Sequence, residues 1–142
     1  TFTYPGMPLI YSGQEVGNTK RLAFFEKDLI PGLSFANSTT AFYTKLVSLK
    51  TKNSALWNNS TAKLLPTPGN NNSVIAYSRS LGVNKVLTVI NASDKTQKVT
   101  LNLTKLNAPY YLFTTGKLAT LKTTLTLTLK PWQYEIYSSK KA

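Results

Sequence analysis

The second half of this chain consists of short β-like segments that recur about every ten residues. Each segment combines apolar with β-branched or aromatic residues, and Gly, Pro, Asn or Asp turn signals separate it from the next. The segments lie at residues 74–80, 85–91, 97–103, 110–114, 123–129 and 134–138. Many short strands at this spacing are typical of two antiparallel sheets packed face to face. The sequence therefore predicts a mainly β fold, an antiparallel β-sandwich with Greek-key-like connections.

The clearest of these segments is residues 124–129, where Thr and Leu alternate strictly. A period of two places the leucines on one side of a strand and the threonines on the other. An amyloid-like, low-complexity segment is the alternative interpretation. Lys122 and Lys130 flank the repeat, however, and such charges oppose edge-to-edge pairing. We therefore expect an ordinary strand with one buried and one solvent-facing side.

The first sixty residues have a different pattern, which divides the chain into domains at residues 1–60 and 61–142. Residues 7–12 form an apolar run without alternation, which predicts a strand buried on both faces in a parallel sheet. Residues 13–37 show no period and predict a long, structured loop. We expect its apolar side chains to be buried, namely Phe24, Phe25, Leu29 and Ile30.

An amphipathic helix of about three turns is predicted to follow this loop. Its apolar side chains recur at helical spacing, and they are Phe42, Tyr43, Leu46, Val47 and Leu49. Asn37, Ser38 or Thr39 can cap its first turn, and Lys50 and Lys52 suit its last turn, where cations favour the helix dipole. A link at residues 53–60 and a wide turn at residues 66–72 then lead into the strands.

The chain is strongly basic, with 17 Lys and Arg against 5 Asp and Glu, which gives a formal charge of +12. Such a charge attracts nucleic acid or an anionic surface. No basic run exceeds two residues, however, and most lysines fall near predicted turns and strand ends. The favoured interpretation is a scattered, solubilising charge, so nucleic acid is not an expected partner.

Several chemistries are excluded by composition, because the chain contains neither Cys nor His. A thiolate nucleophile, a zinc–thiolate site and a histidine base are absent, and we expect no metal and no cofactor. No apolar run reaches the roughly 18 residues that span a bilayer, so we expect no membrane partner. The start at Thr1 suits a fragment or a processed product. The lack of cysteine is compatible with an exported or periplasmic bacterial protein.

Aromatic side chains offer one route to sugar binding, because pyranose faces stack on amphipathic rings. Trp57 and Trp132 are the candidates for such stacking. The alternative is that aromatic residues pack in the core. Strand alternation places Tyr134 on the same side as Ile136, and Trp57 lies where the predicted helix would meet the sandwich.

Three stretches in a fixed order carry a family resemblance: residues 5–15 (PGMPLIYSGQE), 22–28 (LAFFEKD) and 42–56 (FYTKLVSLKTKNSAL). Together they resemble the alpha-amylase family of glycoside hydrolases, in which such stretches form the eighth barrel strand, the loop after it and the last barrel helix. Residues 62–140 are similar to the all-β domain that follows in this family. The resemblance implies a strand-loop-helix remnant of a (β/α)8 barrel ahead of the sandwich.

The resemblance also implies that this chain holds no catalytic residue. Retaining cleavage needs two carboxyl groups about 5–5.5 Å apart, and in this family they arise from barrel strands that precede the eighth. Tyr11, Gln14 and Glu15 would lie at the carboxyl end of a barrel strand, where barrels hold their sites, and are candidates for bordering the substrate. A loop-anchoring role for Glu15 is the alternative.

The leading functional hypothesis is the C-terminal portion of an enzyme that hydrolyses α-glucans such as starch. Its role would be structural, its partner would be the remainder of the barrel, and the isolated chain would be inactive. A carbohydrate-binding module that binds α-glucan and a binder of nucleic acid or anionic surfaces are the alternatives. Without neighbouring strands, we expect residues 1–35 to repack on the sandwich, pair between chains or be poorly ordered.

Overall fold

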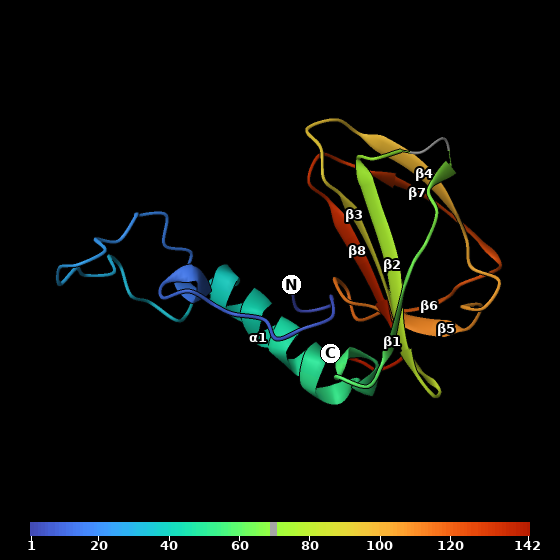
Figure 1. Cartoon of the computed structure of the whole chain (residues 1–142), viewed down its shortest axis with the longest axis horizontal. Coiled ribbons are helices and arrows are strands. Elements are labelled where there is room, and N and C mark those ends of the chain that lie inside the picture. The colour runs from blue at the N-terminus through green and yellow to red at the C-terminus, as the bar shows by residue number, and fades with distance from the viewer. Residues whose placement is uncertain (69–70) are drawn as a thin grey trace.

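The computed structural model describes residues 1–68 and 71–142, and it has a β-sandwich beside one long helix (Figure 1). The helical elements are η1 (Gln14–Val16), α1 (Ser38–Lys52) and η2 (Ser54–Leu56). The strands are β1 (Thr61–Leu64), β2 (Val74–Leu81), β3 (Asn84–Asn91), β4 (Gln97–Asn102), β5 (Pro109–Leu112), β6 (Leu118–Thr120), β7 (Thr124–Leu129) and β8 (Tyr134–Ser138). The mainly β prediction is confirmed. The wide turn predicted at residues 66–72 includes residues 69 and 70, which lie outside the described residues.

The sandwich pairs a large antiparallel sheet with a small one. The large sheet has the order β1-β2-β3-β8-β5-β6, and the small sheet pairs β4 with β7. After β3 the chain crosses to the small sheet as β4, returns to the large sheet as β5 and β6, crosses again as β7 and returns as β8. Strand β8 pairs with β3 and β5, so the neighbours in the large sheet are not sequential. Between the two sheets lies the sandwich core, whose most buried members include Leu87, Val89, Leu101, Leu103, Tyr110 and Leu129.

Strand β7 has the predicted alternation. Leu125 and Leu127 are half-buried and Leu129 is fully buried, whereas all three threonines are exposed. On the outer side, the hydroxyls of Thr126 and of Thr100 in β4 form a hydrogen bond at 3.0 Å. All six predicted strands are present. The sequence does not predict β1, whose four side chains are all exposed, or β6, which has only three residues.

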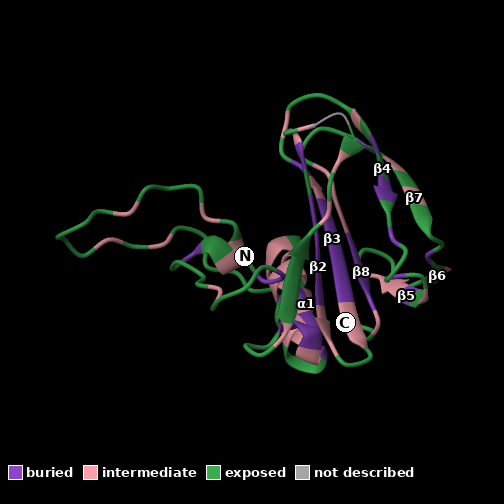
Figure 2. Cartoon of the chain, turned by 45° about the vertical axis from the view of Figure 1, so that its right-hand side comes forward, coloured by how far each residue is buried: buried purple, intermediate pink, exposed green. Residues whose placement is uncertain are grey.

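Helix α1 covers part of the other face of the large sheet. Successive strand residues point to opposite faces, so Val86 and Ile136 face α1 while their neighbours Leu87 and Tyr137 face the sandwich core. Leu46 and Leu49 of α1 are buried in this second cluster. We call it the helix–sheet core. Figure 2 shows the buried residues concentrated in the large sheet and on the adjoining side of α1.

Polar contacts fix the two ends of α1. Asn37 is the N-cap, and its Oδ1 accepts the Thr40 backbone N–H at 2.8 Å. At the other end the fully buried Asn53 accepts the Ala55 N–H at 3.0 Å and donates to Ser138 Oγ of β8 at 2.9 Å. The predicted helix and its cap are confirmed, and Asn53 ties the end of α1 to the sheet.

We expect Asn37→Ala to lower the free energy of unfolding by about 1 kcal/mol, because it leaves the Thr40 N–H without its cap. Chemical denaturation followed by circular dichroism measures this. Ser38→Ala is the matched control, since the Ser38 side chain is exposed and does not cap the helix. Equal effects of the two substitutions would contradict the assignment of the cap.

The buried Tyr137 predicts a loss of stability at alkaline pH. Burial and then the nearby Glu135 raise the pKa of Tyr137 to about 12. The fold therefore favours the neutral hydroxyl, so this contribution is complete below pH 10 and is lost as the pH rises towards 12. Between pH 9 and pH 11.5 we expect wild type to lose about 2 kcal/mol more than Tyr137→Phe. Urea unfolding of both proteins at the two pH values measures it; identical losses would contradict it.

The N-terminal residues differ from the prediction. Residues 7–12 form no strand, and Met7 is 93% exposed. A strand buried on both faces needs a hydrogen-bonded neighbour on each side, and this chain supplies none. Phe24, Phe25 and Leu29 are also exposed rather than buried, whereas Ile30 is half-buried beside Gly13.

Candidate functional site

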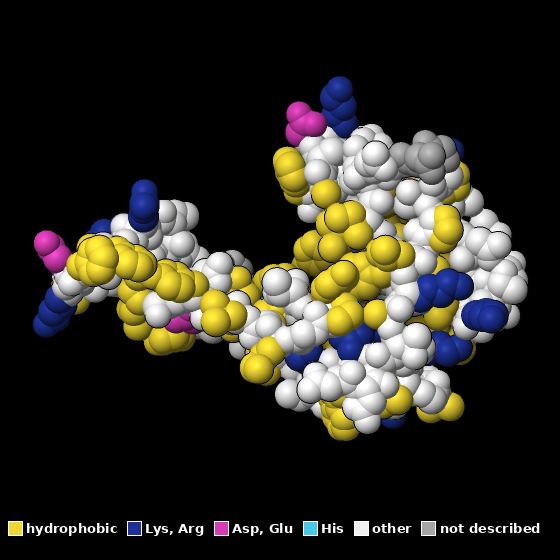
Figure 3. Space-filling model, viewed as in Figure 1, with side chains coloured by type: hydrophobic (Ala, Val, Ile, Leu, Met, Phe, Trp, Pro, Cys, Tyr) yellow, Lys and Arg dark blue, Asp and Glu magenta, His cyan; other side chains and the backbone are white. Residues whose placement is uncertain are grey.

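The main candidate site is the exposed apolar surface of residues 1–36, which we call the N-terminal arm. These residues run back along α1 and then extend away from the sandwich (Figure 1). The arm carries ten of the seventeen exposed large apolar side chains of the described residues: Tyr4, Met7, Leu9, Ile10, Tyr11, Phe24, Phe25, Leu29, Leu33 and Phe35. Figure 3 shows apolar side chains along most of its visible face. The arm is therefore the most apolar free surface of the molecule.

The base of the arm is held against the sandwich. Phe2 and Thr3 are buried, and Thr3 Oγ1 lies 2.8 Å from the Tyr77 hydroxyl of β2. Phe2 belongs to the helix–sheet core. Of the three ways in which residues 1–35 were expected to behave, repacking on the sandwich therefore applies to this base, while most of the arm stays exposed.

A buried arginine joins the base of the arm to the sheet. Arg79 of β2 is only 2% exposed, and its guanidinium donates to the Tyr4 carbonyl at 3.2 Å and to the Trp57 carbonyl at 2.7 Å. Its Nε also donates to Ser60 Oγ at 2.9 Å. One side chain thus connects the arm, the end of the helical segment and the sheet. We call this arrangement the Arg79 clamp.

A second cation lies beside the clamp. Lys50 of α1 donates to the Leu56 carbonyl at 3.0 Å and to the Gly6 carbonyl at 3.3 Å. Burial and then the charge of Arg79 lower the pKa of Lys50, and burial lowers the pKa of Arg79. Both cations thus donate to backbone carbonyls, and neither pairs with a carboxylate among the described residues. This polar junction fixes where the arm leaves the domain.

Within the arm, one carboxylate closes a loop. Asp28 accepts hydrogen bonds from the Lys20 ammonium, from the Ala23 N–H at 3.0 Å and from the Leu29 N–H at 2.8 Å. The bond from Lys20 is the main reason that the pKa of Asp28 is lowered. The closed loop presents Phe24 and Phe25 at its tip, where their rings meet edge to face at 4.7 Å.

The structure brings the three predicted substrate-adjacent residues together at η1. The Tyr11 N–H donates to Gln14 Oε1 at 2.9 Å, and Glu15 Oε2 accepts the Gly13 N–H at 2.9 Å. The Glu15 carbonyl in turn accepts the Thr40 hydroxyl of α1 at 2.7 Å. In this chain the Glu15 carboxylate thus shapes its own loop. That these residues border a substrate stays a prediction.

The two predicted sugar-stacking residues lie at opposite ends of the sandwich. Trp57 follows η2, is half exposed, and donates its indole N–H to the Lys50 carbonyl at 3.0 Å. It lines a surface groove of about 490 Å³ with Phe2, Pro8, Ile10 and Val47. Trp132 lies in the turn between β7 and β8 and is 66% exposed. The structure therefore does not combine them into one platform.

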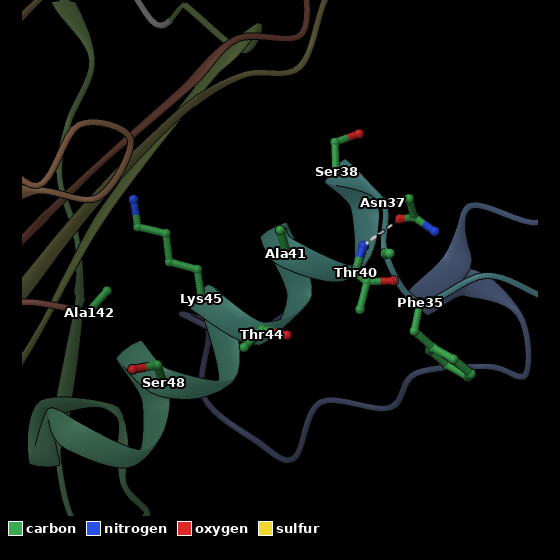
Figure 4. A pocket seen from close by; sticks show the side chains of 10 residues that line it. Phe35, Asn37, Ser38, Thr40, Ala41, Thr44, Lys45, Ser48 and Ala142 are labelled. Atoms are coloured by element: carbon green, nitrogen blue, oxygen red, sulfur yellow. Dashed lines mark hydrogen bonds between the residues drawn. The ribbon is translucent and has the colours of Figure 1, made fainter.

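The outer side of α1 is lined by small side chains. Figure 4 shows Ala41, Thr44 and Ser48 along a groove of about 750 Å³ that also includes Phe35 of the arm. Small residues allow a neighbouring backbone to approach closely. The side of α1 away from the sheet thus has room for another structural element.

Among residues 1–68 and 71–142, no three acidic, His or Cys side chains gather as a set of metal ligands. No helix in them has the length and apolarity needed to cross a bilayer.

Comparison with known families identifies the sandwich. The family model described as the maltogenic amylase C-terminal domain matches residues 66–136, which is half of the chain. The chain belongs to this family. The matched region contains every strand from β2 to β7 and most of β8. The resemblance of the sequence to the alpha-amylase family is therefore confirmed.

Solved structures resemble not only the maltogenic amylase C-terminal domain of this chain but also the residues that precede that domain. A maltogenic alpha-amylase from Thermotoga neapolitana has a TM-score of 0.79 at 19% identity, and the match covers 96% of this chain and 34% of that one. An Anoxybacillus alpha-amylase has a TM-score of 0.68 at 25% identity, covering 96% and 30%. A Nostoc punctiforme debranching enzyme has a TM-score of 0.74 at 21% identity, covering 97% and 29%.

The chain thus spans about a third of the length of these structures. Because the matches cover nearly all of this chain, the shared fold includes the arm and α1 as well as the sandwich. A search of curated proteins found no match.

Sequence reasoning missed the Arg79 clamp. A basic residue inside a β pattern is normally placed on the solvent side, and nothing in the sequence marks Arg79 as buried. The sequence offers only an indirect signal. Arg79 follows Tyr77 by two residues in β2, so both side chains point to the same face of the sheet, the face towards α1 and the arm.

Proposed function

We propose that this chain is the C-terminal portion of an α-glucan hydrolase of the alpha-amylase type, and that its role is structural. In this proposal the arm and α1 complete a (β/α)8 barrel, the sandwich supports α1 from behind, and the catalytic carboxylates come from the rest of that barrel. The observation that carries the proposal is the exposed apolar arm, in a chain that spans a third of the structures it matches.

The exposed apolar surface of the arm supports the proposal that other parts of a barrel cover it. Soluble proteins rarely leave large contiguous apolar patches in water, and larger patches mark contact sites. Met7, Leu9 and Ile10 have the composition of a buried parallel strand but lie exposed without strand partners. Neighbouring barrel strands would bury these side chains and satisfy their backbone groups.

The two sides of α1 support the same arrangement. One side packs Leu46 and Leu49 against the sheet, and the other offers the small residues Ala41, Thr44 and Ser48. A helix packed between a sandwich and a barrel needs both kinds of side. The sandwich would then stabilise the enzyme by holding its last helix.

Hydrogen–deuterium exchange tests this proposal. The isolated chain is compared with the product of its reading frame when the codons before Thr1 are included. We expect the amides of residues 7–12 to exchange about 100-fold or more slowly in the longer protein, because they become paired between strands. The amides of β3 are the internal control, since they are already paired with β2 and β8.

Two results would contradict the proposal. One is unchanged exchange at residues 7–12 in the longer protein, and the other is a reading frame with no coding sequence before Thr1.

A further inference from the structure

The backbone at Trp132 is unusual. Among the described residues it is the one non-glycine residue with a positive φ, at 59°. It occupies the third position of a turn in which the Gln133 N–H donates to the Lys130 carbonyl at 3.1 Å, with Pro131 at the second position. Turns with proline second and positive φ third normally have Gly or Asn there, because a Cβ clashes in the left-handed region. Tryptophan is thus an unfavourable residue for this backbone.

Packing does not explain this choice. The Trp132 side chain is 66% exposed, so little of the ring is buried in the fold. Unfavourable backbone conformations cost about 1–3 kcal/mol, and they gather at sites that contact ligands. The strained turn therefore presents a large, flat, amphipathic ring to solvent.

The turn is held rigidly. The Trp132 N–H donates to the Ser93 carbonyl at 3.1 Å, which joins it to the turn between β3 and β4. The fully buried Asn91 donates to the Lys130 carbonyl at 2.8 Å and to the Lys95 carbonyl at 2.7 Å, so one amide fixes both turns. The Lys130 N–H donates to Gln133 Oε1 at 2.9 Å. A ligand that stacks on Trp132 would meet a platform that is already ordered.

The two turns of this platform also carry exposed charged side chains. Lys130 is exposed on the same turn, and Asp94 and Lys95 are exposed on the adjoining turn. A flat apolar ring beside charged donors and acceptors suits a pyranose, which has an apolar face and hydroxyls at its rim.

We propose that Trp132 and its adjoining turns form a separate binding site for α-glucan chains. The choice of α-glucan among sugars rests on the proposed function. Figure 1 shows the β3–β4 and β7–β8 connections at the end of the sandwich opposite α1. The site is therefore distant from the arm. It holds one stretch of the α-glucan chain while a different stretch lies at the barrel.

The binding test uses the whole 142-residue chain with maltoheptaose and soluble starch. We expect isothermal titration with maltoheptaose to give a dissociation constant of roughly 0.1–1 mM for wild type. We also expect starch in an affinity gel to retard the wild-type chain. Both Trp132→Gly and Trp132→Ala weaken binding by about tenfold or more, because each removes the ring.

The two variants differ in stability, which separates binding from folding. Trp132→Gly raises the melting temperature by about 2–5 °C, since glycine relaxes the left-handed backbone, and Trp132→Ala does not. Val83→Ala in the exposed β2–β3 turn is the control and leaves maltoheptaose affinity unchanged. Trp57→Phe makes Trp132 the only tryptophan, whose fluorescence then shifts on binding.

Absence of binding by wild type, or equal binding by wild type and Trp132→Gly, would overturn this site. Neither result affects the exchange experiment on residues 7–12, so failure of this site and failure of the structural role are distinguishable.

Discussion

Replacing Leu49 with alanine is expected to lower the free energy of unfolding by about 4 kcal/mol. Leu49 is 1% exposed and lies in the helix–sheet core with Val86, Phe113 and Ile136. The substitution removes buried apolar surface and leaves a cavity between α1 and the sheet, which neither element can close without moving. Urea unfolding followed by tryptophan fluorescence and by circular dichroism measures the change.

Val47→Ala is the matched control for this prediction. Val47 lies on the same helix but is exposed, and alanine has the higher helix propensity, so we expect a change within about 0.5 kcal/mol. A loss below about 1 kcal/mol for Leu49→Ala would mean that α1 does not pack firmly against the sandwich. The supporting role proposed for the sandwich would then lose its physical basis.

Replacing Arg79 with methionine is expected to lower the free energy of unfolding by about 3 kcal/mol. The substitution keeps most of the apolar stem but removes the donors to the Tyr4 carbonyl, the Trp57 carbonyl and Ser60 Oγ. Hydrogen bonds from a charged donor are worth about 1.5–3 kcal/mol each and are not additive within one network. The base of the arm should also loosen.

Hydrogen exchange distinguishes the local effect of Arg79→Met from a general loss of stability. We expect faster exchange at residues 3–5 in Arg79→Met than in Leu49→Ala when the two are compared at equal global stability. Arg79→Lys should lie between wild type and methionine, since one ammonium cannot replace the fork of donors. At some buried ionic sites, an apolar side chain offsets the hydrogen bonds that are lost with the charge. If the stability of Arg79→Met were unchanged, the same would hold at this site. The Arg79 clamp would then be ruled out as an anchor.

The sandwich could be predicted from sequence because its signals are local. The alternation at residues 124–129 and the turns between the segments depend on neighbouring residues, so each strand is recognisable alone. The cap at Asn37 and the spacing of Leu46 and Leu49 are local in the same sense. The edge strand β1 was missed because none of its side chains is buried, which removes the apolar pattern that marks a strand.

The arm could not be predicted from its own residues. The apolar run at residues 7–12 is the pattern of a strand in the middle of a parallel sheet, but a strand forms only where neighbours supply hydrogen bonds. Phe24 and Phe25 likewise indicate burial, yet nothing in this chain covers them. The errors therefore fall where the sequence has the pattern for contacts that the chain does not contain.

The candidate site was predicted in part. Sequence reasoning singled out Tyr11, Gln14 and Glu15, which do lie together at η1, but their relation to a substrate and the domain boundary at residue 60 stay predictions. It did not find Arg79 or Asn91, because their roles depend on carbonyls that are distant in sequence. Such long-range partners leave no periodic signal.

In the proposed function, this chain supports glucan hydrolysis and does not perform it. Release of reducing ends from maltoheptaose measures this directly, with the purified 142-residue chain beside the product of the extended reading frame. We expect turnover by the extended product, and a rate for the chain alone that equals that of buffer. Turnover by the chain alone that Glu15→Gln abolishes would contradict the claim and would make Glu15 a catalytic residue.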